Sequence, residues 1–226
     1  MALTVKICGL KTAQTLDAAL ESGTDLVGFV FFPPSPRNLG LEAARVLGER
    51  VAGRAVKVAL TVDATDEMLL DVIAALKPDM LQLHGKETPE RVVAVRTRFR
   101  LPVMKALPIA ERADLSPIRI YAQVADRLLF DARAPKEATR PGGLGTPFDW
   151  TLLAGIKPGV PFMLSGGLDA GNVAEALRIT AAPAVDVSSG VENKPGVKDP
   201  AKIREFIRAA RAAEDPLDLS KAATIQ

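Results

Sequence analysis

The chain has 226 residues, of which 48% are hydrophobic and 25% are charged, and its formal net charge is +2. This length fits one α/β barrel or two small domains, so composition leaves the number of domains open. The near-neutral charge and the lack of a basic run with interleaved aromatic residues argue against a nucleic-acid partner. Charged residues, Gly or Pro interrupt every apolar run well before 18 residues, so we expect no membrane span.

Cysteine and histidine are too scarce for several kinds of site. Cys8 is the only cysteine and His84 is the only histidine. An internal disulfide is therefore excluded, and the sequence offers no basis for a zinc site built from several such ligands. The N-terminus has the pattern of a short apolar strand and not of a signal peptide, so we expect a cytoplasmic protein.

Short apolar segments alternate with amphipathic segments along the whole chain, which predicts parallel strands covered by helices. Eight strands are expected, at residues 3–8, 26–31, 55–60, 80–83, 102–106, 127–131, 161–165 and 184–188. Helices are expected between them, at residues 12–22, 41–51, 66–76, 88–99, 115–125, 150–154 and 170–179. The fifth and sixth of these helices have the weakest periodicity.

Eight strands in this length give about 28 residues per unit, which is typical of a TIM barrel. We therefore predict an α/β fold, a single (β/α)8 TIM barrel with eight parallel strands, over residues 1–213. Residues 214–226 lack a convincing period and are expected to form a C-terminal tail. An open doubly wound sheet is the structural alternative, although no glycine fingerprint for a dinucleotide follows the first strand.

Polar residues gather at the C-terminal ends of the expected strands, where a TIM barrel carries its active site. They are Cys8, His84, Asp131 and Asp186, from the first, fourth, sixth and eighth strands. A cysteine is usually a small buried hydrophobe, but a nearby cation can ionise it and make it a base. Asp131 either exchanges a proton or caps a helix. His84 is expected to be a hydrogen-bonded rim residue, and Asp186 to face the barrel mouth or brace a basic residue.

Glycine and serine cluster after the seventh and eighth strands, at Gly166, Gly167, Ser188, Ser189 and Gly190. Isolated glycines usually make tight turns. Two such loops on adjacent barrel strands, however, let backbone N–H groups approach a phosphate. We therefore predict that these five residues bind the phosphate of a phosphorylated ligand.

Several short motifs, in a fixed order from residue 5 to about residue 200, resemble those of phosphoribosylanthranilate isomerases. They are Lys6-Ile7-Cys8-Gly9-Leu10, Gly28-Phe29-Val30-Phe31, Ser35-Pro36-Arg37, Leu81-Gln82-Leu83-His84-Gly85, Leu129-Phe130-Asp131, Gly142-Gly143-Leu144-Gly145, Phe148-Asp149-Trp150, Leu164-Ser165-Gly166-Gly167-Leu168 and Val185-Asp186-Val187-Ser188-Ser189-Gly190-Val191-Glu192. Each motif alone is weak, and their combination is specific. Leu144 departs from the threonine usual in the family, so no side-chain hydroxyl contact is expected there.

The resemblance implies an isomerase of tryptophan biosynthesis that converts N-(5-phosphoribosyl)anthranilate to 1-(2-carboxyphenylamino)-1-deoxyribulose 5-phosphate. It implies that Asp131 is the general acid and Cys8 the general base of this Amadori rearrangement. Arg37 would bind the anthranilate carboxylate through its planar donor fork. His84 and Asp186 are expected to bind substrate as well. The reaction requires neither a metal nor a redox cofactor, and we expect none.

Other phosphosugar barrels are the enzyme alternatives. Indole-3-glycerol-phosphate synthase would place a catalytic lysine on the first strand, and the histidine-pathway isomerase an aspartate. This chain has Cys8, with Lys6 deeper on the same strand face. A noncatalytic phosphosugar-binding barrel is the alternative from another class. We expect a monomer, and leave a homodimer open.

Overall fold

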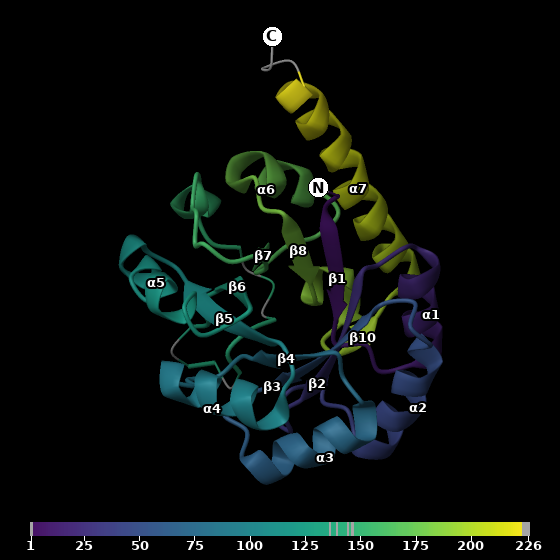
Figure 1. The fold of residues 1–226 in the computed structure, drawn as a ribbon. Helices are drawn as coiled ribbons and strands as arrows, with labels where there is room; N and C mark the ends of the chain where they lie inside the picture. Colours follow the sequence, from purple (N-terminus) through teal and green to yellow (C-terminus); the bar gives the residue numbers. More distant parts are fainter. Residues whose placement is uncertain (1, 136, 139, 144, 146, 223–226) are drawn as a thin grey trace.

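Eight parallel strands close into a barrel in chain order, with β1 paired to β8 (Figure 1). The computed structural model describes residues 2–135, 137–138, 140–143, 145 and 147–222, and side chains up to residue 214. The strands are β1 (Thr4–Cys8), β2 (Leu26–Phe31), β3 (Val56–Thr61), β4 (Met80–Leu83), β5 (Val103–Ile109), β6 (Arg127–Ala132), β7 (Phe162–Leu164) and β8 (Ala184–Val187). The predicted TIM barrel is confirmed, and its closure rules out the open doubly wound sheet.

Helices surround this barrel on the outside (Figure 1). They are α1 (Ala13–Glu21), α2 (Leu41–Val51), α3 (Asp66–Leu76), α4 (Pro89–Phe99), α5 (Ile118–Tyr121), α6 (Val173–Thr180) and α7 (Pro200–Ala222), with 3-10 turns η1 (Arg112–Leu115), η2 (Trp150–Leu153) and η3 (Ser189–Val191). Thr12, Thr65 and Thr88 are N-caps whose hydroxyls accept a backbone N–H from three residues ahead. The helices predicted from residues 12 and 88 therefore begin at their N-cap residues, and Pro89 is the first residue of α4.

The helix predicted at residues 115–125 is wrong. The structure has the turn η1, then Pro117, then the single turn α5. Pro117 has no N–H to donate to a carbonyl of the preceding turn, so the helical hydrogen bonds stop there and restart after it. The fifth strand is longer than predicted, because β5 continues through Pro108 and pairs Ile109 with Ala132 of β6.

The C-terminal segment is more regular than the sequence indicates. A short ribbon of β9 (Glu192–Lys194) and β10 (Val197–Lys198) precedes α7, and neither was predicted. The backbone of α7 stays helical to Ala222, within the range expected to be a tail. Glu214 accepts a hydrogen bond from Leu3 N at 2.6 Å, which ties α7 to the start of β1. The division into a domain at 1–213 and a tail at 214–226 stays a prediction.

Side chains alternate along each strand between the barrel interior and the layer under the helices. On β1, Val5 and Ile7 belong to the large cluster packed between barrel and helices. A second cluster, with Leu26, Met104 and Leu129, fills the barrel interior. A third cluster contains Cys8 with Val30 and Leu60. Each residue of the third cluster is the last one on its strand that points into the barrel, so this cluster lies at the C-terminal end of the barrel.

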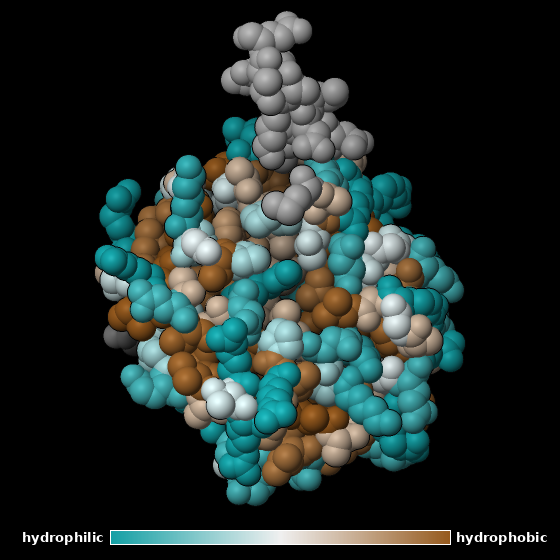
Figure 2. All heavy atoms as spheres, viewed as in Figure 1, coloured by the Kyte–Doolittle hydropathy of each residue, from teal (hydrophilic) through white to brown (hydrophobic). Residues whose placement is uncertain are grey.

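The surface is mixed in character. Figure 2 shows hydrophilic residues spread over the face viewed, with smaller apolar areas between them. Among the described residues, no helix combines the length and the apolar character that crossing a membrane requires.

Candidate active site

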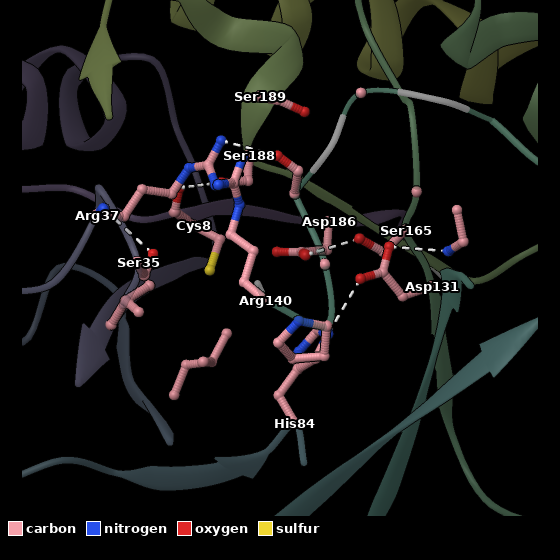
Figure 3. A pocket seen from close by; sticks show the side chains of 18 of the residues that line it. Cys8, Ser35, Arg37, His84, Asp131, Arg140, Ser165, Asp186, Ser188 and Ser189 are labelled. Carbon is pink, nitrogen blue, oxygen red and sulfur yellow. Dashed lines mark hydrogen bonds and ion pairs between the residues drawn. The ribbon is translucent and has the colours of Figure 1, made fainter. Parts of the chain in front are cut away.

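One pocket at the C-terminal end of the barrel brings together nine of the ten predicted site residues. They are Cys8, Arg37, His84, Asp131, Gly166, Gly167, Asp186, Ser188 and Ser189. Figure 3 shows the Cys8 thiol on one side of this pocket and the Asp131 carboxylate on the other, with Asp186 between them in this view. Residues more than 120 positions apart in the chain therefore face one cavity, which is the arrangement expected of a TIM-barrel active site.

The Asp131 carboxylate is held at both oxygens. His84 Nε2 lies 3.0 Å from Asp131 Oδ2, and the backbone N–H of Ala132 donates to Oδ1 at 2.9 Å. Gln82 Nε2 lies 3.0 Å from the other ring nitrogen, Nδ1. With the ring proton on Nε2, His84 donates to Asp131 and accepts from Gln82. His84 is thus the hydrogen-bonded rim residue expected, and it fixes the orientation of the carboxyl group.

The loop after β6 packs directly on these side chains. A Cβ added at Gly142 would overlap Asp131 Oδ2 and would lie 2.9 Å from His84 Nε2. Gly143 has φ +69° and packs against the guanidinium of Arg37. Only residues without a side chain allow this close approach. Leu144, the departure from the family pattern, lies outside the described residues.

Cys8 lies at the apolar wall of the pocket and is 3% exposed. Burial raises the pKa of its thiol above the ordinary value; the charge of Lys6 acts in the opposite direction and that of Asp186 adds to the rise. Burial therefore disfavours the thiolate of Cys8, and only its cationic neighbours favour it.

Asp186 does both things expected of it, since it lines the pocket and braces a basic residue. Lys6 Nζ donates to Asp186 Oδ1 at 2.7 Å, and Ser165 Oγ donates to Oδ2 at 3.0 Å. Lys6 and Asp186 are direct partners in the β1–β8 register. A buried carboxylate with these partners is well satisfied.

Arg37 lies at the pocket, but its donor fork is already in use. Nε and Nη2 donate to the two carboxylate oxygens of Glu192 at 2.7 and 2.8 Å, and Nη2 also donates to Gly143 O at 3.1 Å. Nη1 is the guanidinium nitrogen for which no bond is found among the described residues. In this arrangement the fork formed by Nε and Nη2 faces Glu192, and the role of Arg37 in binding a ligand carboxylate stays a prediction.

The loop at Ser188 and Ser189, after β8, is held in place by a buried lysine, Lys198. Lys198 Nζ donates to Ser188 O at 2.8 Å, to Ser188 Oγ at 3.1 Å and to Glu192 Oε1 at 2.9 Å. Burial lowers the pKa of Lys198 to about 8, although Glu192 opposes the fall. Ser188 Oγ donates in turn to Cys8 O at 3.2 Å. Because this hydroxyl is engaged, backbone N–H groups are the better phosphate donors in this loop.

Gly190 does not line the pocket. A Cβ there would overlap the carbonyl oxygen of Leu168, so this glycine allows the loops after β7 and β8 to pack together. Ser165 and Arg140 also line the pocket, and neither was among the predicted site residues. Ser165 stands directly before the glycine pair and follows the rule for strand ends, which could have found it. Arg140 lies in a loop between expected elements, where an arginine looks like an ordinary solvated residue.

Comparison with known proteins agrees with this geometry. The family model described as N-(5'phosphoribosyl)anthranilate (PRA) isomerase matches residues 5–209. The N-(5'-phosphoribosyl)anthranilate isomerase of Nitrobacter winogradskyi is 64% identical over 217 residues, which cover 96% of each chain. The alignment thus covers nearly all of both proteins.

Solved structures show the same architecture. Monomers of the dimeric phosphoribosylanthranilate isomerase of Thermotoga maritima match with a TM-score of 0.80 and 33% identity, over 93% of this chain and 99% of that one. A phosphoribosyl anthranilate isomerase in complex with reduced 1-(o-carboxyphenylamino)-1-deoxyribulose 5-phosphate matches with the same four values. This chain belongs to the N-(5'-phosphoribosyl)anthranilate isomerase family.

Proposed function

We propose that this isomerase converts N-(5-phosphoribosyl)anthranilate to 1-(2-carboxyphenylamino)-1-deoxyribulose 5-phosphate with Asp131 as general acid and Cys8 as general base. The observation that supports this assignment is that both side chains line one pocket together with the loops after β7 and β8. A thiol and a carboxyl group are sufficient for an Amadori rearrangement, which moves protons and changes no net composition. The complex of a relative with a reduced form of this product supports the same substrate class.

Asp131 serves the first half of the reaction. A proton delivered to the ring oxygen of the ribose allows the C1–O bond to break while the anthranilate nitrogen forms a Schiff base with C1. The hydrogen bond from His84 fixes Asp131 Oδ2, so the carboxyl group does not have to be ordered during the step. Gly142 packs directly against this pair of side chains.

Cys8 serves the second half. The thiolate removes the proton from C2 of the sugar, and the electron pair shifts to give an enolamine. Protonation at C1 and formation of the C2 ketone then give the product. The pocket wall formed by Val30 and Leu60 around Cys8 is apolar, which keeps water away from the carbon that loses its proton.

The two anionic ends of the substrate need separate partners. The loop at Gly166 and Gly167 and the loop at Ser188 and Ser189 line one part of the pocket and offer backbone N–H groups to the phosphate. Arg37 offers Nη1 to the carboxylate of the anthranilate ring.

A fluorescence assay of freshly generated phosphoribosylanthranilate tests substrate and reaction together. We expect the purified protein to consume this compound and to release the deoxyribulose phosphate. A protein that retains the ligand but forms no product would instead be a noncatalytic phosphosugar-binding barrel, and the proposed roles of Cys8 and Asp131 would fail.

Replacing Arg37 with Ala is expected to weaken binding of a product analogue that carries the anthranilate carboxylate more than binding of ribose 5-phosphate. A hydrogen bond to a charged group contributes about 1.5–3 kcal/mol, roughly 10- to 150-fold in Kd. Calorimetric titration with both ligands measures the difference. Glu192→Gln is the matched control, because it releases the fork of Arg37 and keeps the guanidinium. Equal weakening of both ligands in Arg37→Ala would place Arg37 at the phosphate or in a structural role.

Oligomeric state and location remain predictions for this chain. The Thermotoga maritima relative is described as dimeric and has been obtained as monomers. We propose a monomer for this chain. A homodimer measured by sedimentation would contradict this proposal. We also keep the cytoplasm as the expected location.

A further inference from the structure

Lys6 is a lysine buried inside the barrel whose charge the proposed mechanism does not yet use. It is 0% exposed, although an ammonium group is rarely placed in such a position without a specific partner. Its Nζ donates to Asp186 Oδ1 at 2.7 Å. Because β1 residues alternate in direction, Lys6 points to the same side as Cys8, two residues ahead and one layer nearer the mouth.

The amine of Lys6 and the thiol of Cys8 share the space beside Gly28 of β2. A Cβ built on Gly28 would lie 2.9 Å from Cys8 Sγ and 3.1 Å from Lys6 Nζ. Gly28 pairs with Cys8 in the β1–β2 register, so any side chain there would separate the two groups. The missing side chain thus leaves ammonium and sulfur in one small compartment.

Few other charges reach this compartment. Asp186 of β8 and Lys198 of β10 are the further charged groups that act on Cys8. The elements beside it on the other side contribute Gly28 and Val30 of β2 and Leu60 of β3, which do not titrate. Across the pocket lie the titratable groups Arg37, His84 and Asp131. Lys6 is the cation that influences Cys8 most.

We propose that Lys6 is a positioning residue that keeps Cys8 competent as a base by holding an ammonium group beside its sulfur, and that Asp186 limits this effect. The inference rests on the proposed role of Cys8. Removal of the substrate proton requires the thiolate, and the apolar wall alone would keep the thiol protonated. Lys6 supplies the opposite charge from behind, where it does not compete with the substrate for space.

The pKa shifts of Lys6 and Cys8 agree with this arrangement in direction. Burial lowers the pKa of Lys6, but Asp186 and Cys8 together outweigh it, so the pKa lies above the ordinary value and the amine stays charged. Burial raises the pKa of Cys8, Lys6 lowers it, and Asp186 raises it. The two charged neighbours of Cys8 therefore act on its pKa with opposite signs.

The test compares Asp186→Asn with the double variant Lys6→Met/Asp186→Asn. The double variant removes both charges of the buried pair, whereas Asp186→Asn leaves Lys6 beside Cys8 and the acceptor oxygen of an amide. Circular dichroism checks that both proteins fold. Because Cys8 is the only cysteine, ultraviolet absorbance of the thiolate against pH reports this residue alone once a matched Cys8→Ser spectrum is subtracted. We expect the thiol pKa to be higher in the double variant by ~1 or more, the lower range for the effect of a neighbouring charge.

The rate profile supplies a second readout. Below the thiol pKa, a rise of this size leaves about tenfold less thiolate, so kcat/KM falls about tenfold and recovers as the pH is raised. Asp186→Asn alone should lower the thiol pKa relative to the unmodified protein. A loss of rate that does not recover at higher pH would overturn the proposal in favour of a structural role for Lys6.

Lys105 gives the control, because it is also a buried lysine on a barrel strand, paired with Glu87 at 2.7 Å. It faces the helix layer, on the opposite side of β5 from Met104 in the barrel interior, and so lies away from Cys8. Lys105→Met/Glu87→Gln should leave the thiol pKa unchanged. An equal thiol pKa with and without Lys6, or an equal shift in this control, overturns the proposal. Full turnover in Cys8→Ser would instead overturn the role of Cys8 as base, and the thiol titration would still report whether Lys6 controls the sulfur.

Discussion

Replacing Cys8 with Ser is expected to lower turnover at least ~100-fold, the lower range for general acid or base catalysis. A hydroxyl is close in shape to a thiol, so the variant should fold and should still bind a product analogue. The serine hydroxyl is far less acidic than a thiol, however, and the charge of nearby Lys6 is not enough to ionise it at neutral pH. Single-turnover rates with freshly generated phosphoribosylanthranilate measure the loss, and analogue titration measures binding.

A matched change in the same pocket wall separates chemistry from packing. Leu60 lies in the apolar cluster with Cys8, so Leu60→Val disturbs the wall without removing a titratable group. We expect this control to lose much less activity than Cys8→Ser. Near-normal turnover in Cys8→Ser would assign Cys8 to packing, and the base would have to be sought elsewhere in the pocket.

Replacing Asp131 with Asn is expected to lower kcat at least ~100-fold and to change phosphate affinity little. The amide has nearly the same shape, but its single oxygen can accept from only one of the two donors, His84 Nε2 or the backbone N–H of Ala132, and it has no acidic proton to deliver to the ring oxygen. The loops after β7 and β8 are the proposed phosphate site, and Asp131 makes no hydrogen bond to them among the described residues. Steady-state kinetics and titration with ribose 5-phosphate test the two parts.

Asp186→Asn is the informative comparison for Asp131→Asn. Asp186 is also a buried carboxylate at the pocket, but Lys6 and Ser165 already hold its two oxygens. We expect its replacement to cost less in kcat than that of Asp131. If turnover survives in Asp131→Asn and collapses in Asp186→Asn, the acid is the carboxylate of β8.

The sequence alone determined the barrel and the placement of its candidate groups. Periodicity is a local property, so the strands at residues 26–31 and 80–83 and the helices at 41–51 and 66–76 were predicted with the bounds the structure has. The order of elements and the rule for strand ends then placed Cys8 and Asp131 at one end of the barrel. Local signals failed at residues 115–125, where Pro117 divides a helical pattern that looks continuous.

Only the tertiary structure decided which groups are paired and which remain available. Arg37 meets Glu192 across 155 residues, and Lys6 meets Asp186 across 180. Gly190 packs so closely against Leu168 that a side chain there would overlap its carbonyl oxygen, a contact between two loops that the sequence does not show. Such contacts depend on the closure of the barrel and on the register of β1 with β8, which no short segment specifies. The reason is that the hydrogen bonds and the desolvation of a charged group depend on the distant residues that the barrel brings next to it.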